Sequence, residues 1–294
     1  RYGVGREAHS HAGPAQEVVD EIAAAGVPRD TKPDQNNWAP RFGFAYSPSV
    51  SGGFLGKLFG QGESVFRGGF GMGYDVLFYN ILSVNASNYP RVVNSITTNP
   101  VDQFPTLAPK IATLPPFNPL NAFVNTPTGT QNPTVNFWSL SFQRQFKSNY
   151  VFEAGYTGND SFHGVRQGQG NVAILTQAQA SAVIASGNAN SIPTVQARRV
   201  NPAWGSRTLI EATALGEYHA MFVRFDKKLS NGLLLGTNYT WSANFSDNDE
   251  SLGVTDITNS SPQIPQNFFN YRNEWSRSVF DRPHRFVIHY SYEV

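Results

Sequence analysis

The chain has 294 residues, of which 40% are hydrophobic, 13% aromatic and only 15% charged, and its formal net charge is +1. The charged share is well below the roughly 25% of a soluble globular domain, and the even charge balance gives no sign of a nucleic-acid partner. A mean hydropathy of −0.34 excludes a helical membrane protein, and the absence of cysteine excludes disulfides and thiolate metal sites. Composition alone therefore leaves a membrane β-barrel or a secreted β-sandwich or propeller.

The first 35 residues are expected to be a piece of an extracellular loop. Residues 15–25 within it are predicted to form a short helix that stops at Gly26. His9 and His11 lie in polar sequence nearby, and two ligands are too few for a metal site. Because the chain opens at Arg1 without an apolar signal stretch, we expect a processed N-terminus or a fragment.

Strands are the main predicted elements, because short segments alternate between aromatic and polar or small residues. In the first of them, Phe42, Phe44 and Tyr46 alternate with a second set of polar or small residues: Arg41, Gly43 and Ala45. Two later pairs read as hairpins, joined at 147–149 and at 230–232, where Asn-Gly is a strong turn signal. The predicted strands lie near 39–47, 64–75, 136–146, 150–157, 218–229, 233–242 and 285–294.

The residues opposite the aromatic face favour a membrane barrel. They include charged residues such as Arg67, Glu153 and Arg224, and unpaired charge in a dry sandwich core is strongly unfavourable. Connections also alternate between short or intermediate (47–63, 147–149, 230–232) and long (76–135, 158–217, 243–284). We therefore predict an all-β fold: an antiparallel transmembrane β-barrel segment of about seven strands with short periplasmic turns and long extracellular loops.

The long loops are expected to be largely irregular, since the 76–135 loop is rich in proline and proline is excluded from helix interiors and central strands. Residues 176–186 are predicted to form a short helix. Asp247, Asp249 and Glu250 are a weak candidate Ca²⁺ site, and solvated loop charge is the favoured interpretation. The run from Asp281 to Arg285 is expected to have a structural role at the extracellular rim, through pairing of Arg and Asp across neighbouring strands.

No catalytic motif of the Gly-x-Ser-x-Gly or His-Glu-x-x-His type occurs, so we expect no enzymatic activity, no catalytic residues and no cofactor. The glycine-rich run at 68–73 lies inside a predicted strand and lacks the Lys-Ser/Thr ending of a phosphate loop. On the lumen face, small residues leave room for a plug or let the strand bend. We therefore expect Gly69, Gly71 and Gly73 to face the lumen and either to leave room for a plug or to let the strand bend.

Several runs resemble Oar-like TonB-dependent receptors, which carry an N-terminal carboxypeptidase-regulatory-like domain. The runs are NNWAPRFGFAY at 36–46, SVFRGGFGMGYD at 64–75, FWSLSFQRQF at 137–146, FEAGYTGND at 152–160, FVRFDKKLSNGLLLGTNYTWS at 222–242 and EWSRSVFDRPHRFVIHY at 274–290. They include all the predicted strands, in order. The long loops carry no such resemblance.

The resemblance implies an active importer of the bacterial outer membrane, with a barrel of about 22 strands and a plug in its lumen. The partners implied are outer-membrane lipid, the TonB complex through N-terminal parts not seen in this sequence, and a small-molecule, glycan or peptide substrate. Seven strands are too few to close a bacterial barrel, so we expect a fragment. The alternatives are a passive porin or structural surface barrel, which an upstream plug would exclude, and a secreted β-rich glycan-binding module, which membrane fractionation would exclude.

Overall fold

A computed structural model describes residues 33–76, 118–147, 149–188, 192–249 and 265–293. The chain divides into two compact units, whose described parts are treated separately. The larger comprises 33–76, 131–167 and 212–293, and the smaller comprises 118–130 and 168–211. The predicted helix at 15–25 and the loop piece at 1–32 lie outside the described residues.

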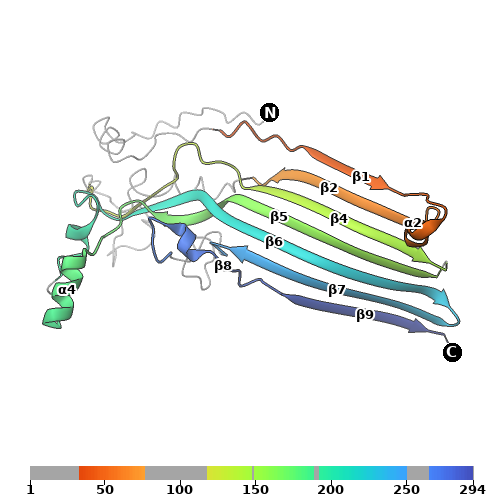
Figure 1. Cartoon of the computed structure of the whole chain (residues 1–294). Coiled ribbons are helices and arrows are strands. Elements are labelled where there is room, and N and C mark those ends of the chain that lie inside the picture. Colours follow the sequence, from red (N-terminus) through yellow and green to blue (C-terminus); the bar gives the residue numbers. More distant parts are fainter. Residues whose placement is uncertain (1–32, 77–117, 148, 189–191, 250–264, 294) are drawn as a thin grey trace, which may run out of the picture. The chain divides into compact units, whose positions relative to one another are not determined.

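The larger unit is an antiparallel sheet (Figure 1). Its strands are β1 (Arg41–Tyr46), β2 (Ser64–Tyr74), β4 (Thr134–Phe146), β5 (Tyr150–Gln169), β6 (Arg207–Ser230), β7 (Leu233–Ser246), β8 (Ser276–Arg277) and β9 (His284–Tyr292). The strand order is β1-β2-β4-β5-β6-β7, with β8 and β9 both paired to β7. The seven predicted strands are all present, and consecutive long strands are neighbours in the sheet.

Short connections follow every second strand, at one end of the sheet (Figure 1). In the β6–β7 turn, Asn231 and Gly232 have φ values of 51° and 73°, the positive values that a two-residue hairpin turn requires. The longer β1–β2 connection contains a helix that the sequence did not predict, α2 (Gly53–Phe59). The predicted alternation of shorter and longer connections is confirmed.

Two strands are much longer than predicted. β5 continues to Gln169 instead of 157, and β6 begins at Arg207 instead of 218. Both extensions take up sequence that we expected to be loop. Their residues do not alternate between apolar and polar, so a search for period-2 alternation misses them.

The smaller unit has a compact apolar centre. Its described elements are β3 (Phe123–Asn125), α4 (Gln177–Ser186), a 3₁₀ turn (Gln196–Arg198) and the outer ends of β5 and β6. β3 pairs in parallel with β6, Phe123 opposite Arg207. Ile210 and Phe123 are buried, and the Phe123 ring lies 6.1 Å from that of Trp204. The 76–135 loop was expected to be largely irregular, and β3 is an exception within it: a three-residue strand between turns that is too short to give a periodic signal.

The predicted helix at 176–186 is confirmed as α4. Thr176 and Gln179 form a capping box at its start, in which each side chain satisfies a backbone N–H of the other residue. At the end of the helix, Gly187 adopts the left-handed conformation that commonly terminates helices.

Candidate functional site

Strand pairing sorts the side chains of the larger unit onto two faces. Phe66 lies opposite Phe142, which lies opposite Ala154, and one residue along the strand Arg67 lies opposite Ser141, which lies opposite Gly155. Because successive residues point to opposite faces, the first set defines an apolar face and the second a polar face. The same two faces continue through the β4–β5 and β6–β7 hairpins, where mostly apolar residues pair with one another on one face and mostly polar or small residues pair on the other.

The apolar face carries large hydrophobic side chains that the sheet does not cover. Leu140, Met221 and Ile288 are each more than half exposed. Neighbouring rings pack across strands, with centroids 5.6 Å apart for Phe42 and Phe70 and 5.0 Å apart for Phe66 and Phe142. A continuous surface of this kind is rare on soluble monomers. It matches the lipid-facing surface of a barrel.

Polar groups limit this apolar face on both sides. Towards the short turns, Arg144 on β4 and Lys227 on β6 interrupt it. Towards the long loops, Asn136 follows on β4 and His219 on β6, each eight residues from the first limit. Eight residues span about 26 Å along a strand, and about 20 Å in height after a barrel tilt near 40°, close to the roughly 25 Å apolar band of outer-membrane barrels.

Two Tyr–His pairs mark the limit nearer the long loops. The Tyr156 hydroxyl and His219 Nδ1 are joined by a 2.6 Å hydrogen bond, and His219 Nε2 lies 2.7 Å from a Glu217 carboxylate oxygen. The Tyr239 hydroxyl and His284 Nδ1 form a second pair at 2.8 Å. These groups combine an apolar body with a polar end, as in the aromatic girdles of membrane interfaces.

The family comparison agrees with this two-faced sheet. A family model described as an outer membrane β-barrel domain matches residues 11–294. The chain belongs to the outer membrane β-barrel domain family. Its described strands are therefore an open piece of barrel wall in the bacterial outer membrane, with β1 and β9 as edges, the apolar face towards lipid and the polar face towards the lumen.

Among solved structures, the chain is similar to the outer membrane transporter YddB from Escherichia coli, with 9% identity and a TM-score of 0.33. The match covers 63% of this chain and 18% of the transporter, so it involves less than a fifth of the transporter's length. No curated protein matches. None of the helices described in the structure is both long and apolar enough to span a membrane.

The lumen face of the barrel wall carries paired polar groups. Arg67 donates a 2.5 Å hydrogen bond to the Gln143 amide oxygen, and the Arg224 guanidinium lies 2.7 Å from the Asp226 carboxylate. Neighbouring side chains thus satisfy charge on this face, in agreement with the inference from sequence that it is not a dry core.

Several lumen-face glycines are covered by aromatic rings of the next strand. A Cβ at Gly155 would lie 2.5 Å from the Phe222 ring, and a Cβ at Gly71 would overlap the Phe137 ring, over which Arg41 stacks at 5.9 Å. At Gly69 and Gly73 a Cβ would meet neighbours at 3.3 and 3.4 Å. At Gly71 the Phe137 ring fills the space beside the glycine, so room for a plug does not account for that position; the alternative, that small residues let the strand bend, stays a prediction.

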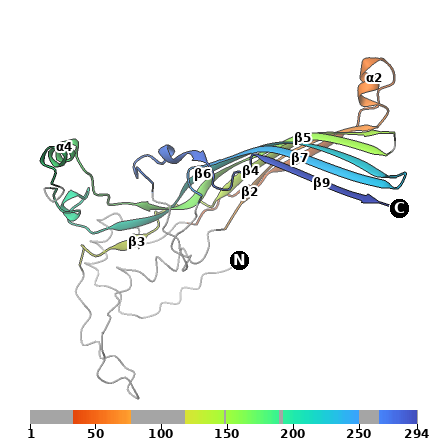
Figure 2. The same cartoon turned by 90° about the horizontal axis from the view of Figure 1, so that it is seen from below.

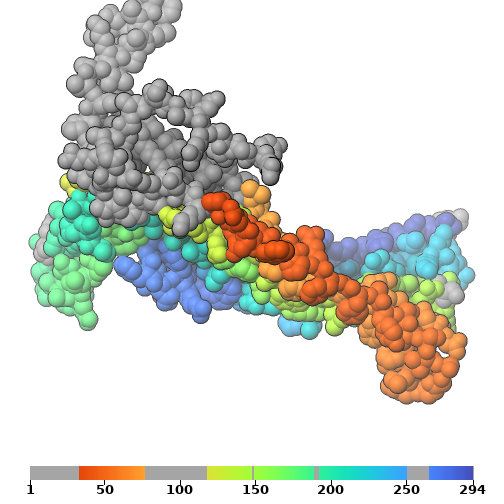
Figure 3. Space-filling model, turned by 90° about the horizontal axis from the view of Figure 1, so that it is seen from above, coloured from red at the N-terminus to blue at the C-terminus, as the bar shows by residue number. Residues whose placement is uncertain are grey.

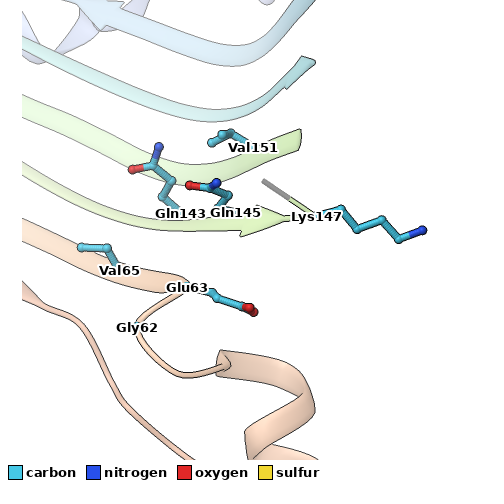
Figure 4. A pocket seen from close by; sticks show the side chains of 7 residues that line it. All are labelled: Gly62, Glu63, Val65, Gln143, Gln145, Lys147 and Val151. Carbon is cyan, nitrogen blue, oxygen red and sulfur yellow. The ribbon is translucent and has the colours of Figure 1, made fainter. Parts of the chain in front are cut away.

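A polar hollow of about 440 Å³ lies on the lumen face near the short turns (Figure 4). Gln143 and Gln145 project from β4 between β2 and β5, while the Lys147 ammonium extends away from them. Gly62, Glu63, Val65 and Val151 complete the lining. Amide and carboxylate groups of this kind suit hydrogen bonding to a polar chain or solute, and they include no paired nucleophile and base.

At the extracellular end, a buried ion pair holds the segment after β7 against the wall. Arg166 on β5 and Asp247 pair with side chains only 3% and 2% exposed. Asp247 also accepts a 2.8 Å hydrogen bond from the backbone N–H of Leu215, and the Arg166 guanidinium stacks 4.4 Å from the Tyr271 ring.

These contacts involve part of the candidate Ca²⁺ site. Asp247 binds Arg166, and a carboxylate oxygen of Asp249 accepts a 2.8 Å hydrogen bond from the backbone N–H of Val279. Glu250 lies outside the described residues. No cluster of three or more potential metal ligands occurs in the part of the chain that the structure describes. The Ca²⁺ site stays a prediction, while Asp247 makes a structural contact with Arg166 that no sequence pattern reveals.

The Asp281–Arg285 run forms a second contact at this rim. Asp281 accepts hydrogen bonds from Arg277 at 2.5 Å and from the backbone N–H of Asn244 on β7 at 2.9 Å. The hydrogen bond from Arg277 is the main reason that the pKa of Asp281 is lowered. The structural role expected at the rim is supported, although the Arg partner of Asp281 is four residues back in the same segment rather than on a neighbouring strand.

In the smaller unit, the chain between β5 and β6 is organised around the buried amide of Asn171. Its Nδ2 donates to the carbonyl oxygens of Asn201, Trp204 and Gly205 at 2.8–3.0 Å, and its Oδ1 accepts from the Asn201 backbone N–H. Gln169 adds hydrogen bonds from the end of β5. This part of the extracellular loop is therefore an ordered platform that carries α4. One Asn among many in the loop sequence gives no sign of that role.

Proposed function

We propose that this chain is a wall segment of a TonB-dependent active importer of the Oar-like type, without enzymatic activity. The observation that carries the proposal is the ordered set of strand motifs that resembles those receptors. The wall structure is compatible with it: a lipid face, a lumen face with hydrogen-bonded charge, and extracellular segments with their own internal contacts. The substrate class stays open among small molecules, glycans and peptides.

The proposal requires a plug domain in the whole protein, and conductance tests this directly. The full-length protein that contains this chain would be reconstituted in planar bilayers and its current recorded before and after addition of urea. A plugged receptor should conduct little until urea unfolds the plug, and the current should fall again when urea is removed. A stable open conductance without urea would instead establish the passive porin.

Dependence on TonB needs a second measurement on the same protein. The purified periplasmic domain of TonB should bind the full-length protein, and the binding should be lost when the segment before the plug is deleted. Absence of binding to an otherwise plugged barrel would reject the TonB-dependent type while keeping the barrel assignment. Recovery of the protein only in the soluble secreted fraction would favour the glycan-binding alternative.

A further inference from the structure

Helix α2 is a seven-residue helix in the β1–β2 connection, at the end of the wall that has the short turns. Its flanks are held together, since Val50 N–H donates to the Gly60 carbonyl at 3.1 Å and Ser49 bridges to Gln61. Gly52 and Gly60 have φ values of 89° and 70°, which glycine adopts most readily. The β1–β2 connection is thus closed at its base by hydrogen bonds, which fix the position of α2 at this end of the sheet.

The helix contacts the lipid face of the wall. The Phe59 ring lies 5.6 Å from the Phe66 ring and 6.3 Å from the Phe142 ring, both in edge-on geometry. Phe66 and Phe142 are paired residues of the apolar face, one row of the sheet closer to its middle than the pair Ser64 and Arg144. Phe59 therefore packs within the apolar band, and Figure 2 shows α2 standing off one face of the sheet.

The remaining apolar side chains of α2 are exposed among the described residues. Phe54 is 77% exposed, Leu55 54% and Leu58 42%. At 100° per residue these three positions and Phe59 occupy one side of the helix, and Lys57 lies on the other. In the space-filling view, the orange residues that include α2 form a lobe beside the sheet (Figure 3).

We propose that α2 is an interfacial membrane anchor, whose Phe54, Leu55 and Leu58 insert into the periplasmic leaflet of the outer membrane beside the barrel wall. We infer that lipid covers these side chains, because Phe59 packs against Phe66 and Phe142 and so makes the apolar side of α2 continuous with the lipid-facing surface. An apolar arc opposite a lysine is the pattern of helices that lie in the plane of a membrane interface.

The charges around α2 fit the same location. Lys57 lies on the side of α2 away from its apolar arc, while Arg144, at the short-turn limit of the apolar face, pairs with Glu63 at 3.3 Å. A lysine at this depth can reach the phosphate groups of the lipid while its stem stays in apolar surroundings, which fits the position of Lys57.

Spin labelling tests the proposal, and the cysteine-free sequence makes each introduced cysteine unique if the rest of the protein also lacks cysteine. The variants L55C and L58C report on the apolar arc, and K57C is the matched control on the opposite side of the same helix. Each would be made in the full-length protein, labelled with a nitroxide and reconstituted in vesicles of phosphatidylethanolamine and phosphatidylglycerol. The readout is the accessibility of the label to oxygen, which concentrates in lipid, and to a water-soluble nickel chelate.

The expected result is an oxygen-to-nickel accessibility ratio several-fold higher at positions 55 and 58 than at position 57. Equal and high nickel accessibility at all three positions would place α2 in water and overturn the proposal. Low accessibility to both reagents at positions 55 and 58 would show that protein covers the arc and would equally overturn it. None of these outcomes depends on whether the parent protein requires TonB.

Discussion

Replacement of Asp247 by asparagine should detach the segment after β7 from the extracellular end of the wall. The carboxylate is buried and pairs with the buried Arg166 guanidinium, so D247N leaves a cation in low-dielectric surroundings without its partner. Breaking a buried ion pair in this way typically destabilises by about 3–5 kcal/mol. We place D247N near 3 kcal/mol, because its amide oxygen can still accept from the Leu215 N–H and Tyr271 still stacks on Arg166.

Hydrogen exchange at Leu215 is the appropriate assay, because the N–H of that residue donates to Asp247. A loss of about 3 kcal/mol corresponds to an increase in local opening of about a hundredfold or more. The double variant with Arg166→Met and Asp247→Leu should be less destabilised than D247N, since it removes both buried charges together. Unchanged exchange at Leu215 in D247N, or a double variant that is destabilised as much as D247N, would refute the argument.

Three further predictions follow from the two faces and the rim. Leu140→Arg, on the lipid face near mid-height, should destabilise the folded barrel by about 2–4 kcal/mol in denaturant titrations in lipid, whereas Ser139→Arg, on the lumen face opposite Gly69 and Thr157, should change it little; equal effects would contradict the assignment of faces. Gly155→Leu, which places a side chain against the Phe222 ring, should lower stability by about 1–3 kcal/mol, and combining it with Phe222→Ala should restore part of the loss. The pKa of Asp281 is lowered in the folded state, chiefly by its hydrogen bond from Arg277. The contribution of Asp281 to stability is therefore complete above the unfolded pKa of about 3.9 and is lost as the pH falls through the folded pKa. Hydrogen-exchange protection of the Asn244 amide, which donates to Asp281, should decline only in acid, and D281N should remove that decline.

The membrane-spanning part of the fold was predictable because lipid imposes a simple rule on sequence. From Tyr150 to Thr157 every second side chain of β5 lies on the lipid face, and the resulting alternation is visible without a structure. The same holds for Met221, Val223 and Phe225 on β6. The β6–β7 turn was predictable as well, because Asn231 and Gly232 are residue types that readily adopt the positive φ values of a two-residue hairpin turn.

The contacts at the rim could not be predicted, because they join residues that are far apart in the sequence and ordinary in type. Arg166 and Asp247 are 81 positions apart, and the residue type alone does not show whether an arginine is buried or exposed. The Asn171 hydrogen bonds likewise depend on backbone carbonyls at 201–205, which any residue supplies. Helix α2 was missed for a different reason, since seven residues give too few turns for a helical period to emerge.

The end of the alternation on β5 and β6 marks the membrane surface and not the end of either strand. On β5 the last residue of the alternating apolar series is Tyr156, and Tyr156 is bonded to His219 at the polar limit of the lipid face. Beyond that level water can solvate both faces, so the side chains need no alternation, while the backbone groups still pair with the neighbouring strand. Strand length is therefore set by hydrogen bonding between neighbours and the apolar pattern by lipid. In this family, a strand predicted from alternation should be treated as the membrane-embedded part of a longer one.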